Sequence, residues 1–396
     1  MIAFLTSADT EILTLSRVVH ELPPEVPGVR AANASSPAAV ELAEAAATAV
    51  IMHLLGGQRP FEPAFSAIRD SCLARGVPFV ACAGDSVFDP ELADLSTVPL
   101  DTVRQVFAYL CQGGAVNLRN MLLLLAGLPA GPPQELPWFG VYERQGTAQS
   151  GPAVAVLFYR AHWMSGNTEF VDALCERLER YGCSTVPIFV YSLKPENAAQ
   201  IEPLLRQAGV AAIVNTLSFA SGSVDWLREL DVPVLQAIVS TSSEAEWRGA
   251  QSGLSPLDTA MNVALPEFDG SIITVPVSFK QELSQAETLG SPVVRYAPQA
   301  ERVDAFARLT TKWAALRAKP NAQKRVAFVL SNYPTKNARL GNAVGLDTPA
   351  SLLAILRAMG QAGYVVGELP DAGDELIFRL IDRCSNDREF LTEQQL

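Results

Sequence analysis

The sequence is poor in the residues that build most metal, disulfide and redox sites. Its 396 residues include only three histidines, His20, His53 and His162, and six cysteines with no CxxC pair. So few histidines make a metal cage of imidazoles alone implausible. Scattered cysteines in apolar patterns are typical of buried thiols, not of zinc knuckles or a disulfide framework.

Positive charge and long apolar runs are scarce as well. Thirty Lys and Arg against 42 Asp and Glu leave a formal net charge of −12, which argues against a surface that neutralises nucleic-acid phosphates or anionic lipid. No apolar run approaches the ~20 residues that span a bilayer, and no basic region precedes the short apolar run at the N-terminus. We therefore expect a cytoplasmic protein with neither nucleic acid nor membrane as partner.

Three common catalytic motifs are missing. The sequence contains no G-x-G-x-x-G, no G-x-x-x-x-G-K-[ST] and no G-x-S-x-G, the loops that hold a dinucleotide, hold a nucleotide triphosphate, or present a serine nucleophile. We expect no nucleotide site on this chain, and we expect His20 and His53 to be packed in a helix and a strand.

What the sequence does have is a regular alternation of elements. Hydrophobic residues make up 49% and charged residues 18%, which favours a compact fold. Short β-branched runs alternate with stretches at helical spacing, as in MIAFLTS, AVIMHLL and PFVACAG near the start. This pattern predicts an α/β protein made of successive Rossmann-like or flavodoxin-like domains, each a doubly wound parallel sheet.

Breaker clusters divide the chain into three predicted domains. Residues 1–130 form the first, which ends at a Gly- and Pro-rich segment, and 131–320 form the second, with an extended functional loop and short helices at 249–275. The third, 321–396, has two expected strands, RVAFVLSNYP and YVVGEL, and two helices. Two strands cannot bury a sheet on both faces, so we expect this domain to be incomplete and the chain truncated.

Candidate functional residues follow the strand AVAVLFYR. The segment from Arg160 to Thr168 is expected to be a loop at the carboxyl end of a parallel strand, the edge where such sheets bind ligands. It carries His162 and Trp163, and the polar residues Ser165, Asn167 and Thr168 are natural caps for the next helix. On pattern alone, a packed histidine beside a capped helix remains the more frequent arrangement.

Two other segments hold candidate residues. The loop at 331–349 is long, polar and basic, with Lys336 and Arg339 as possible partners of ligand carboxylates. The turn at 264–270 holds Glu267 and Asp269, which suit a divalent cation or a proton acceptor. A solvated loop and a solvated corner are the alternatives for these two segments.

Several ordered blocks then indicate a family. FYRAHWMSGNTEFVDALCERLERYG, LDVPVLQAIVS, NVALPEFDGSI and SNYPTKNARLGNAVGLDTPASL resemble the large subunit of aerobic cobaltochelatase, the CobN family, which is related to the large (H) subunit of magnesium chelatase. The resemblance runs from about 152 to 367, and family members are about three times longer. This chain is similar to their N-terminal portion.

The resemblance implies insertion of Co²⁺ into hydrogenobyrinic acid a,c-diamide during cobalamin biosynthesis. It implies that ATP and Mg²⁺ bind a separate AAA+ motor subunit, which acts with a third subunit (CobS and CobT type). On that basis we predict that His162 and Glu267, supported by Asp269, receive the metal or the ring protons. Imidazole suits cobalt better than magnesium. The residues predicted to hold the substrate are Arg160, Trp163, Asn167, Asn332, Tyr333, Lys336 and Arg339.

Two other functions stay open at this point. One is a magnesium chelatase large subunit that acts on protoporphyrin IX. The other is a non-catalytic small-molecule-binding protein with hinged Rossmann-like lobes. The predicted mechanism also depends on His162 and the acids at 267 and 269 converging on one site, although about a hundred positions separate them in the sequence.

Overall fold

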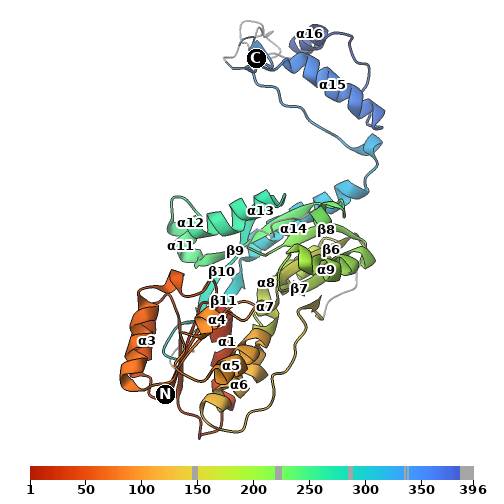
Figure 1. Ribbon diagram of the computed structural model, residues 1–396. Helices are drawn as coiled ribbons and strands as arrows, with labels where there is room; N and C mark the ends of the chain where they lie inside the picture. Colours follow the sequence, from red (N-terminus) through yellow and green to blue (C-terminus); the bar gives the residue numbers. More distant parts are fainter. Residues whose placement is uncertain (145–149, 219–224, 284–288, 334–335, 337–338, 384–396) are drawn as a thin grey trace. The chain divides into compact units, whose positions relative to one another are not determined.

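The computed structural model describes the chain except for residues 145–149, 219–224, 284–288, 334–335, 337–338 and 384–396. It forms two compact units, Met1–Ala314 and Ala315–Leu396 (Figure 1). The first unit holds two sheets with helices on both faces, so the predicted α/β class is confirmed. Among the described residues no helix is long and apolar enough to cross a membrane.

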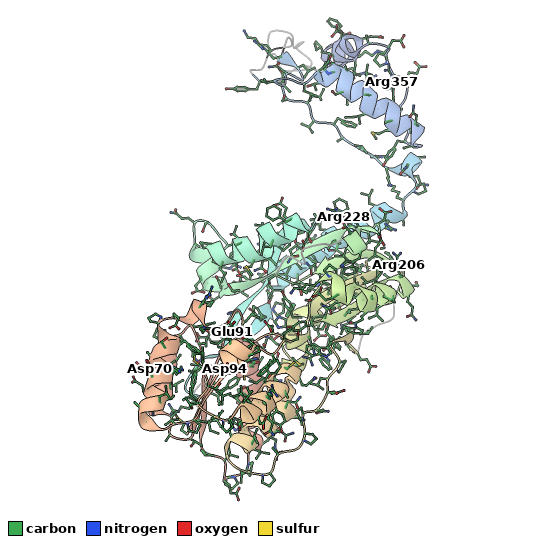
Figure 2. All side chains as sticks on the ribbon, in the orientation of Figure 1. Asp70, Glu91, Asp94, Arg206, Arg228 and Arg357 are labelled. Carbon is green, nitrogen blue, oxygen red and sulfur yellow. The ribbon has the colours of Figure 1, made fainter. Side chains whose placement is uncertain are left out.

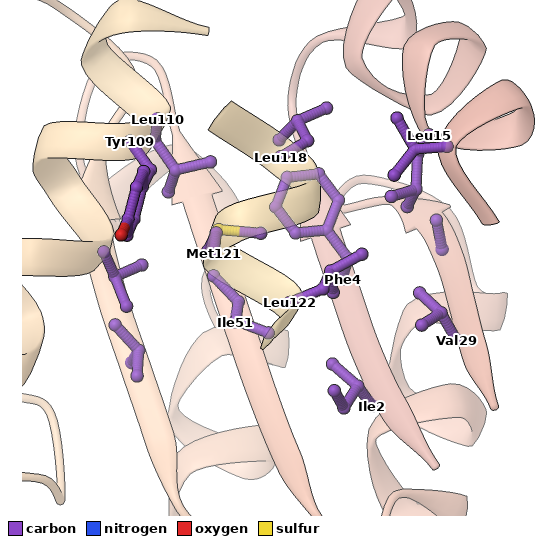
Figure 3. Packing of buried hydrophobic residues seen from close by; sticks show 14 of the residues in the cluster. Ile2, Phe4, Leu15, Val29, Ile51, Tyr109, Leu110, Leu118, Met121 and Leu122 are labelled. Atoms are coloured by element: carbon purple, nitrogen blue, oxygen red, sulfur yellow. The ribbon is translucent and has the colours of Figure 1, made fainter. Parts of the chain in front are cut away.

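The first sheet has four parallel strands in the order β2-β1-β3-β4. Alternate strand residues point to opposite faces, so Ile2 and Phe4 pack under α1, α5 and α6 while Ala3 and Leu5 pack under α2 and α3. Figure 3 shows the first of these cores. The elements are β1 Ile2–Thr6, α1 Asp9–Val18, η1 Val19–Glu21, β2 Val29–Asn33, α2 Ala38–Ala45, β3 Ala49–Leu54, η2 Arg59–Phe61, α3 Ala64–Arg75, β4 Phe79–Ala83, α4 Pro90–Ala93, α5 Leu100–Gln112 and α6 Gly114–Leu125.

The second sheet has seven strands in the order β11-β10-β9-β8-β6-β7-β5. Its five central strands are parallel, and β5 and β11 add antiparallel edges that the sequence pattern did not predict. The elements are β5 Phe139–Val141, β6 Ala153–Tyr159, α7 Arg160–Ser165, α8 Glu169–Arg180, β7 Ser184–Val190, α9 Pro195–Gln207, β8 Val210–Asn215, α10 Asp225–Arg228, β9 Val234–Ser243, β10 Ile272–Leu283, β11 Val293–Pro298 and α14 Ala300–Ala318.

Short helices fill the segment expected as an extended loop at 249–275. They are α11 Glu244–Gly249, α12 Pro256–Thr259, a π-helical turn η3 Ala260–Ala264, and α13 Leu265–Phe268. The last three are continuous and lead directly to β10. Figure 2 labels Asp70 on α3 and Arg206 on α9, whose side chains are exposed.

The second unit contains helices but, among its described residues, no strand. Its elements are η4 Asn321–Gln323, α15 Thr348–Gln361 and α16 Gly373–Arg383. Two segments were expected as strands, RVAFVLSNYP at 325–334 and YVVGEL at 364–369. Residues 325–331 and 364–369 are irregular, and Val329 and Val365 are 94% and 80% exposed. The strand prediction was wrong because a strand needs a hydrogen-bonded neighbour along its length, and among the described residues the first segment has only an isolated bridge between Asn332 and Leu340.

Domain boundaries were predicted at 130 and 320. Both sheets fall within Met1–Ala314, because residues of β10 and β11 pack into the core of the first sheet. The separate domains 1–130 and 131–320, and the incompleteness of 321–396, stay predictions.

Candidate functional site

The carboxyl edge of β6 leads into a short helix. Arg160–Ser165 form α7, and Gly166 ends it in the left-handed conformation, with φ of 65°, which glycine adopts without strain. The expectation of a loop here was wrong, because Arg160 to Ser165 are all compatible with a helical turn. Of the predicted caps, Thr168 occupies the N-cap position of α8, without a side-chain capping bond, whereas the Ser165 hydroxyl donates to the Ala161 carbonyl of its own helix.

His162 lies in α7, just after the carboxyl end of β6, and packs against aromatic rings. Its ring centroid is 5.1 Å from that of Phe170 and 5.3 Å from that of Tyr296, with both pairs edge-on. The residue is 8% exposed, and its Nδ1 has no hydrogen-bond partner. Burial lowers the pKa of His162 to about 4, so the imidazole is neutral at pH 7. A neutral imidazole can bind a metal or accept a proton.

The described residues place no acidic ligands around this imidazole. Within them there is no group of three or more His, Cys, Asp and Glu side chains that could hold a metal ion. The role of His162 stays a prediction.

Glu267 and Asp269 lie elsewhere in the second sheet. They immediately precede β10, whereas His162 follows the end of β6, and β6, β8, β9 and β10 are all parallel. The acids are therefore at the amino edge and the histidine at the carboxyl edge. Three strand spacings also separate β10 from β6, about 14 Å. The structure does not bring the predicted group together, because the helix from α12 to α13 carries the chain back across the sheet.

Arg160 and Trp163, predicted to hold substrate, make contacts inside the protein. The Arg160 guanidinium donates to the carbonyls of Gln112, Leu136 and Pro137 at 2.8, 3.2 and 2.8 Å, and it is 3% exposed. Burial lowers its pKa, against the opposing effects of Cys111 and Tyr191.

Trp163 stacks on Phe189 of β7, with centroids 4.2 Å apart and planes at 4°. One face of its indole is therefore already covered inside the protein. Asn167 accepts a hydrogen bond from the Tyr296 backbone N–H at 3.0 Å, so it holds β11 against the turn after α7.

The remaining candidates are in the second unit. Tyr333 is 85% exposed and Lys336 and Arg339 are also exposed. Asn332 forms an isolated bridge with Leu340, and its buried Oδ1 has no hydrogen-bond partner among the described residues. The Asp347 side chain caps α15, because it accepts a hydrogen bond from the Ala350 N–H. The ligand-holding roles stay predictions.

The structure adds charged groups that the sequence reasoning missed. At the carboxyl edge of the first sheet the Asp9 carboxylate is 2.6 Å from the Lys280 Nζ of β10, and the Glu11 carboxylate is 2.8 Å from the Nδ1 of His53. Burial and then the charges of Asp9 and Asp258 raise the pKa of Tyr296, so its hydroxyl stays protonated.

These contacts place the carboxyl edge of the first sheet against the second. Helix α1, which carries Asp9 and Glu11, packs beside β11 and α7, and the Ser86 N–H, after β4, donates to the Tyr191 hydroxyl, after β7. We call this region, defined by Asp9, Lys280, Ser86 and Tyr191, the junction. In parallel α/β sheets the carboxyl edge is where ligands bind, and here two such edges meet.

Comparison with known proteins decides the family. The sequence model described as CobN/Magnesium Chelatase matches residues 107–396. The chain belongs to this family. It is 40% identical to the aerobic cobaltochelatase subunit CobN of Pseudomonas aeruginosa over 98% of the chain and 34% of that protein. The family resemblance noted in the sequence is thereby confirmed.

Two further comparisons agree with this membership. The chain is 30% identical to the large (H) subunit of the magnesium chelatase of Chlorobaculum parvum, over 59% of the chain and 18% of that protein. The solved catalytic subunit of cobaltochelatase from Mycobacterium tuberculosis matches with a TM-score of 0.63 and 37% identity, over 96% of this chain and 33% of that one. The chain thus spans about a third of the length of its CobN relatives.

Proposed function

We propose that this chain is part of the large, tetrapyrrole-binding subunit of a cobaltochelatase. The main support is the 40% identity to a CobN subunit across nearly the whole chain. A matching fold at 37% identity to a cobaltochelatase catalytic subunit gives further support. The reaction inserts Co²⁺, as substrate, into hydrogenobyrinic acid a,c-diamide.

Metal insertion requires the removal of water from the ion and the acceptance of protons from the ring nitrogens. The neutral imidazole of His162 suits either task. Glu267 and Asp269 lie at the amino edge of the second sheet, so they do not share one ring or one ion with His162. Arg160 would act indirectly in this proposal, because it holds the carbonyls around residues 112 and 136–137. The exposed cations Lys336 and Arg339 suit the carboxylates of a ligand.

ATP hydrolysis in this proposal belongs to partner subunits, an AAA+ motor and a third subunit. The sequence has no phosphate-binding G-x-x-x-x-G-K-[ST] loop of its own, and the coupling of ATP to insertion would require docking of these partners. A magnesium chelatase acting on protoporphyrin IX is the second candidate, favoured by the 30% identity to the large chain of a magnesium chelatase.

The test uses the full-length protein with both partner subunits. We would offer Co²⁺ or Mg²⁺ with hydrogenobyrinic acid a,c-diamide or protoporphyrin IX, add ATP, and follow the absorbance of the metallated product. Cobalt insertion into the corrinoid supports the proposal, and magnesium insertion into the porphyrin supports the second candidate. Binding of a tetrapyrrole without insertion of either metal would refute both and leave a non-catalytic binding protein.

His162→Ala and Glu267→Gln in the same assay test the assigned roles. We expect His162→Ala to lower the insertion rate, because it removes a group that binds the metal or accepts a proton. Glu267 lies at the other edge of the sheet, so a loss of rate in Glu267→Gln would indicate a separate role there. Normal rates and normal substrate affinity in both variants would show that these residues take no part.

A further inference from the structure

The β10–β11 ribbon leaves the second sheet and reaches the first. Strand β10 pairs with β9 from Ile272 to Lys280 and with β11 from Ser278 to Leu283, so its last three residues pair with β11 and not with β9. Beyond that point the ribbon runs along α1 of the first sheet (Figure 1). A two-stranded ribbon is marginally stable alone, so its course depends on what it packs against.

At its far end the ribbon covers the outer edge of the first sheet. Strand β2 is an edge strand, and its Ala31 N–H donates to the Leu289 carbonyl at 3.1 Å. Gly290, with φ of 73°, lies against Arg30, so that a Cβ there would be 3.1 Å from an Arg30 nitrogen. An uncovered edge strand invites pairing with other chains, and here the Leu289 carbonyl occupies one N–H of that edge, at Ala31.

The side chains of the ribbon belong to the core of the first sheet. Leu289 and Val293 are 0% and 1% exposed, and they are part of the same apolar cluster as Phe4 and Met121. Leu283 packs against that cluster as well. The core of the first sheet is therefore completed by residues that follow it in the chain by more than 150 positions.

Polar contacts tie the same ribbon to both sheets. The Lys280 ammonium pairs with Asp9 of α1 at 2.6 Å, and the Tyr296 N–H donates to Asn167, in the turn between α7 and α8. The Tyr296 ring also packs edge-on against His162. One element thus contacts both carboxyl edges at the junction.

We propose that the described parts of this ribbon, residues 278–283 and 289–298, form a strap that fixes the two carboxyl edges in one arrangement before any ligand binds. Leu289 and Lys280 are its positioning residues. Separation of the sheets would expose Leu289, leave the Ala31 N–H unpaired and break the Lys280–Asp9 ion pair. The junction is therefore preformed, and a tetrapyrrole binds without movement of one sheet relative to the other. The catalytic part of this inference rests on the proposed function.

The first measurement is a distance in the full-length protein. Spin labels on unnatural amino acids replace Asp70 on α3 and Arg206 on α9, one beside each sheet and both exposed. We expect a single narrow distance distribution that hydrogenobyrinic acid a,c-diamide does not shift. We expect Leu289→Ala to broaden it, and the matched control Leu73→Ala, at a half-exposed leucine of α3, to leave it narrow.

The second measurement is the kinetics of metal insertion with partner subunits. If the competent arrangement falls to about a tenth of molecules in Leu289→Ala, the KM for the tetrapyrrole rises about tenfold while kcat is kept, because bound substrate selects that arrangement. A merely structural loss would lower the amount of active enzyme and thus the apparent kcat, without raising KM.

Where Leu289→Ala fails to fold, Lys280→Met breaks the ion pair without touching the core and gives the same two readouts. A ligand-induced shift in the wild-type distance, or narrow distributions in both strap variants, would overturn the proposal. Absence of chelatase activity with every metal would refute the proposed function instead, and the distance measurement would still decide whether the strap exists.

Discussion

Asp258 offers the sharpest test of how the second sheet holds its helices. Its carboxylate is fully buried and accepts hydrogen bonds from the Ser240 hydroxyl at 2.7 Å, the Thr241 N–H and hydroxyl at 2.9 Å, and the Asn262 amide at 3.1 Å. These bonds join the end of β9 to the helix that runs through α12, η3 and α13. No ion pair within the described parts of the chain involves this carboxylate.

The expected loss of stability depends on which hydrogen-bond donors lose their acceptor. Asp258→Ala leaves four donors without it, and those of Ser240 and Asn262 belong to fully buried residues. Each unsatisfied buried group costs about 1–3 kcal/mol, so we expect a loss of about 3–5 kcal/mol after partial relaxation. Asp258→Asn keeps one acceptor oxygen for three donors, and the Ser240 hydroxyl can turn to accept from the new amide. We expect this variant to lose about 1–2 kcal/mol, the share due to charge.

The assay is urea unfolding of the purified chain at pH 7, followed by tryptophan fluorescence, with Asp70→Asn as an exposed control. We expect the loss of unfolding free energy to rise in the order Asp70→Asn, Asp258→Asn, Asp258→Ala. Equal losses for Asp258→Asn and Asp258→Ala would refute this order, because the negative charge itself would then be essential and a cation would have to be its partner. A loss below ~1 kcal/mol for Ala would show that the bonds contribute little.

Three further predictions concern ionisable groups. Burial opposes the charged form of His53, but the effect of the Glu11 carboxylate is larger, and the pKa of His53 is raised. The ion pair therefore stabilises the folded state fully below about pH 6.5. This stabilisation is lost as pH rises through the raised pKa. Urea midpoints should fall over this range in the wild type and stay flatter in Glu11→Gln, and parallel curves would contradict this. For His162, whose pKa is lowered to about 4, ring NMR signals should show no protonation above pH 6, and a midpoint near 6.5 would mean that the ring is solvated. Arg160→Lys should lower the free energy of unfolding by about 2–4 kcal/mol, because an ammonium cannot replace the guanidinium bonds to three carbonyls. The control Arg206→Lys, on the exposed face of α9, should lower it by under ~0.5 kcal/mol. Equal losses in the two variants would contradict this role for Arg160.

The order of strands and helices in the first unit was readable from local pattern. Apolar residues at helical spacing over 64–75 and 301–317 predict two helices, and the structure has α3 at Ala64–Arg75 and α14 at Ala300–Ala318. Such agreement is expected because period 3.6 and period 2 in apolar residues are set by the local geometry of the chain. The family was also readable, because ordered blocks of sequence carry it without any knowledge of contacts.

The position of each candidate side chain was not readable. The sequence placed Arg160 in a ligand-holding loop, but backbone carbonyls from residues 112, 136 and 137 surround its guanidinium. The sequence placed Glu267 beside His162, but the direction of one short helix puts it at the other edge of the sheet. Both outcomes depend on contacts between distant segments, which periodicity does not encode.

By itself the sequence determined the α/β class, most element boundaries and membership of the CobN/magnesium chelatase family, since these depend on residue type and local spacing. Only the tertiary structure decided that a ribbon from the second sheet completes the core of the first, that His162 is enclosed by Phe170 and Tyr296, and that segments 326–330 and 364–369 form no strands here. Burial and strand pairing are properties of the neighbours that a segment finds in space.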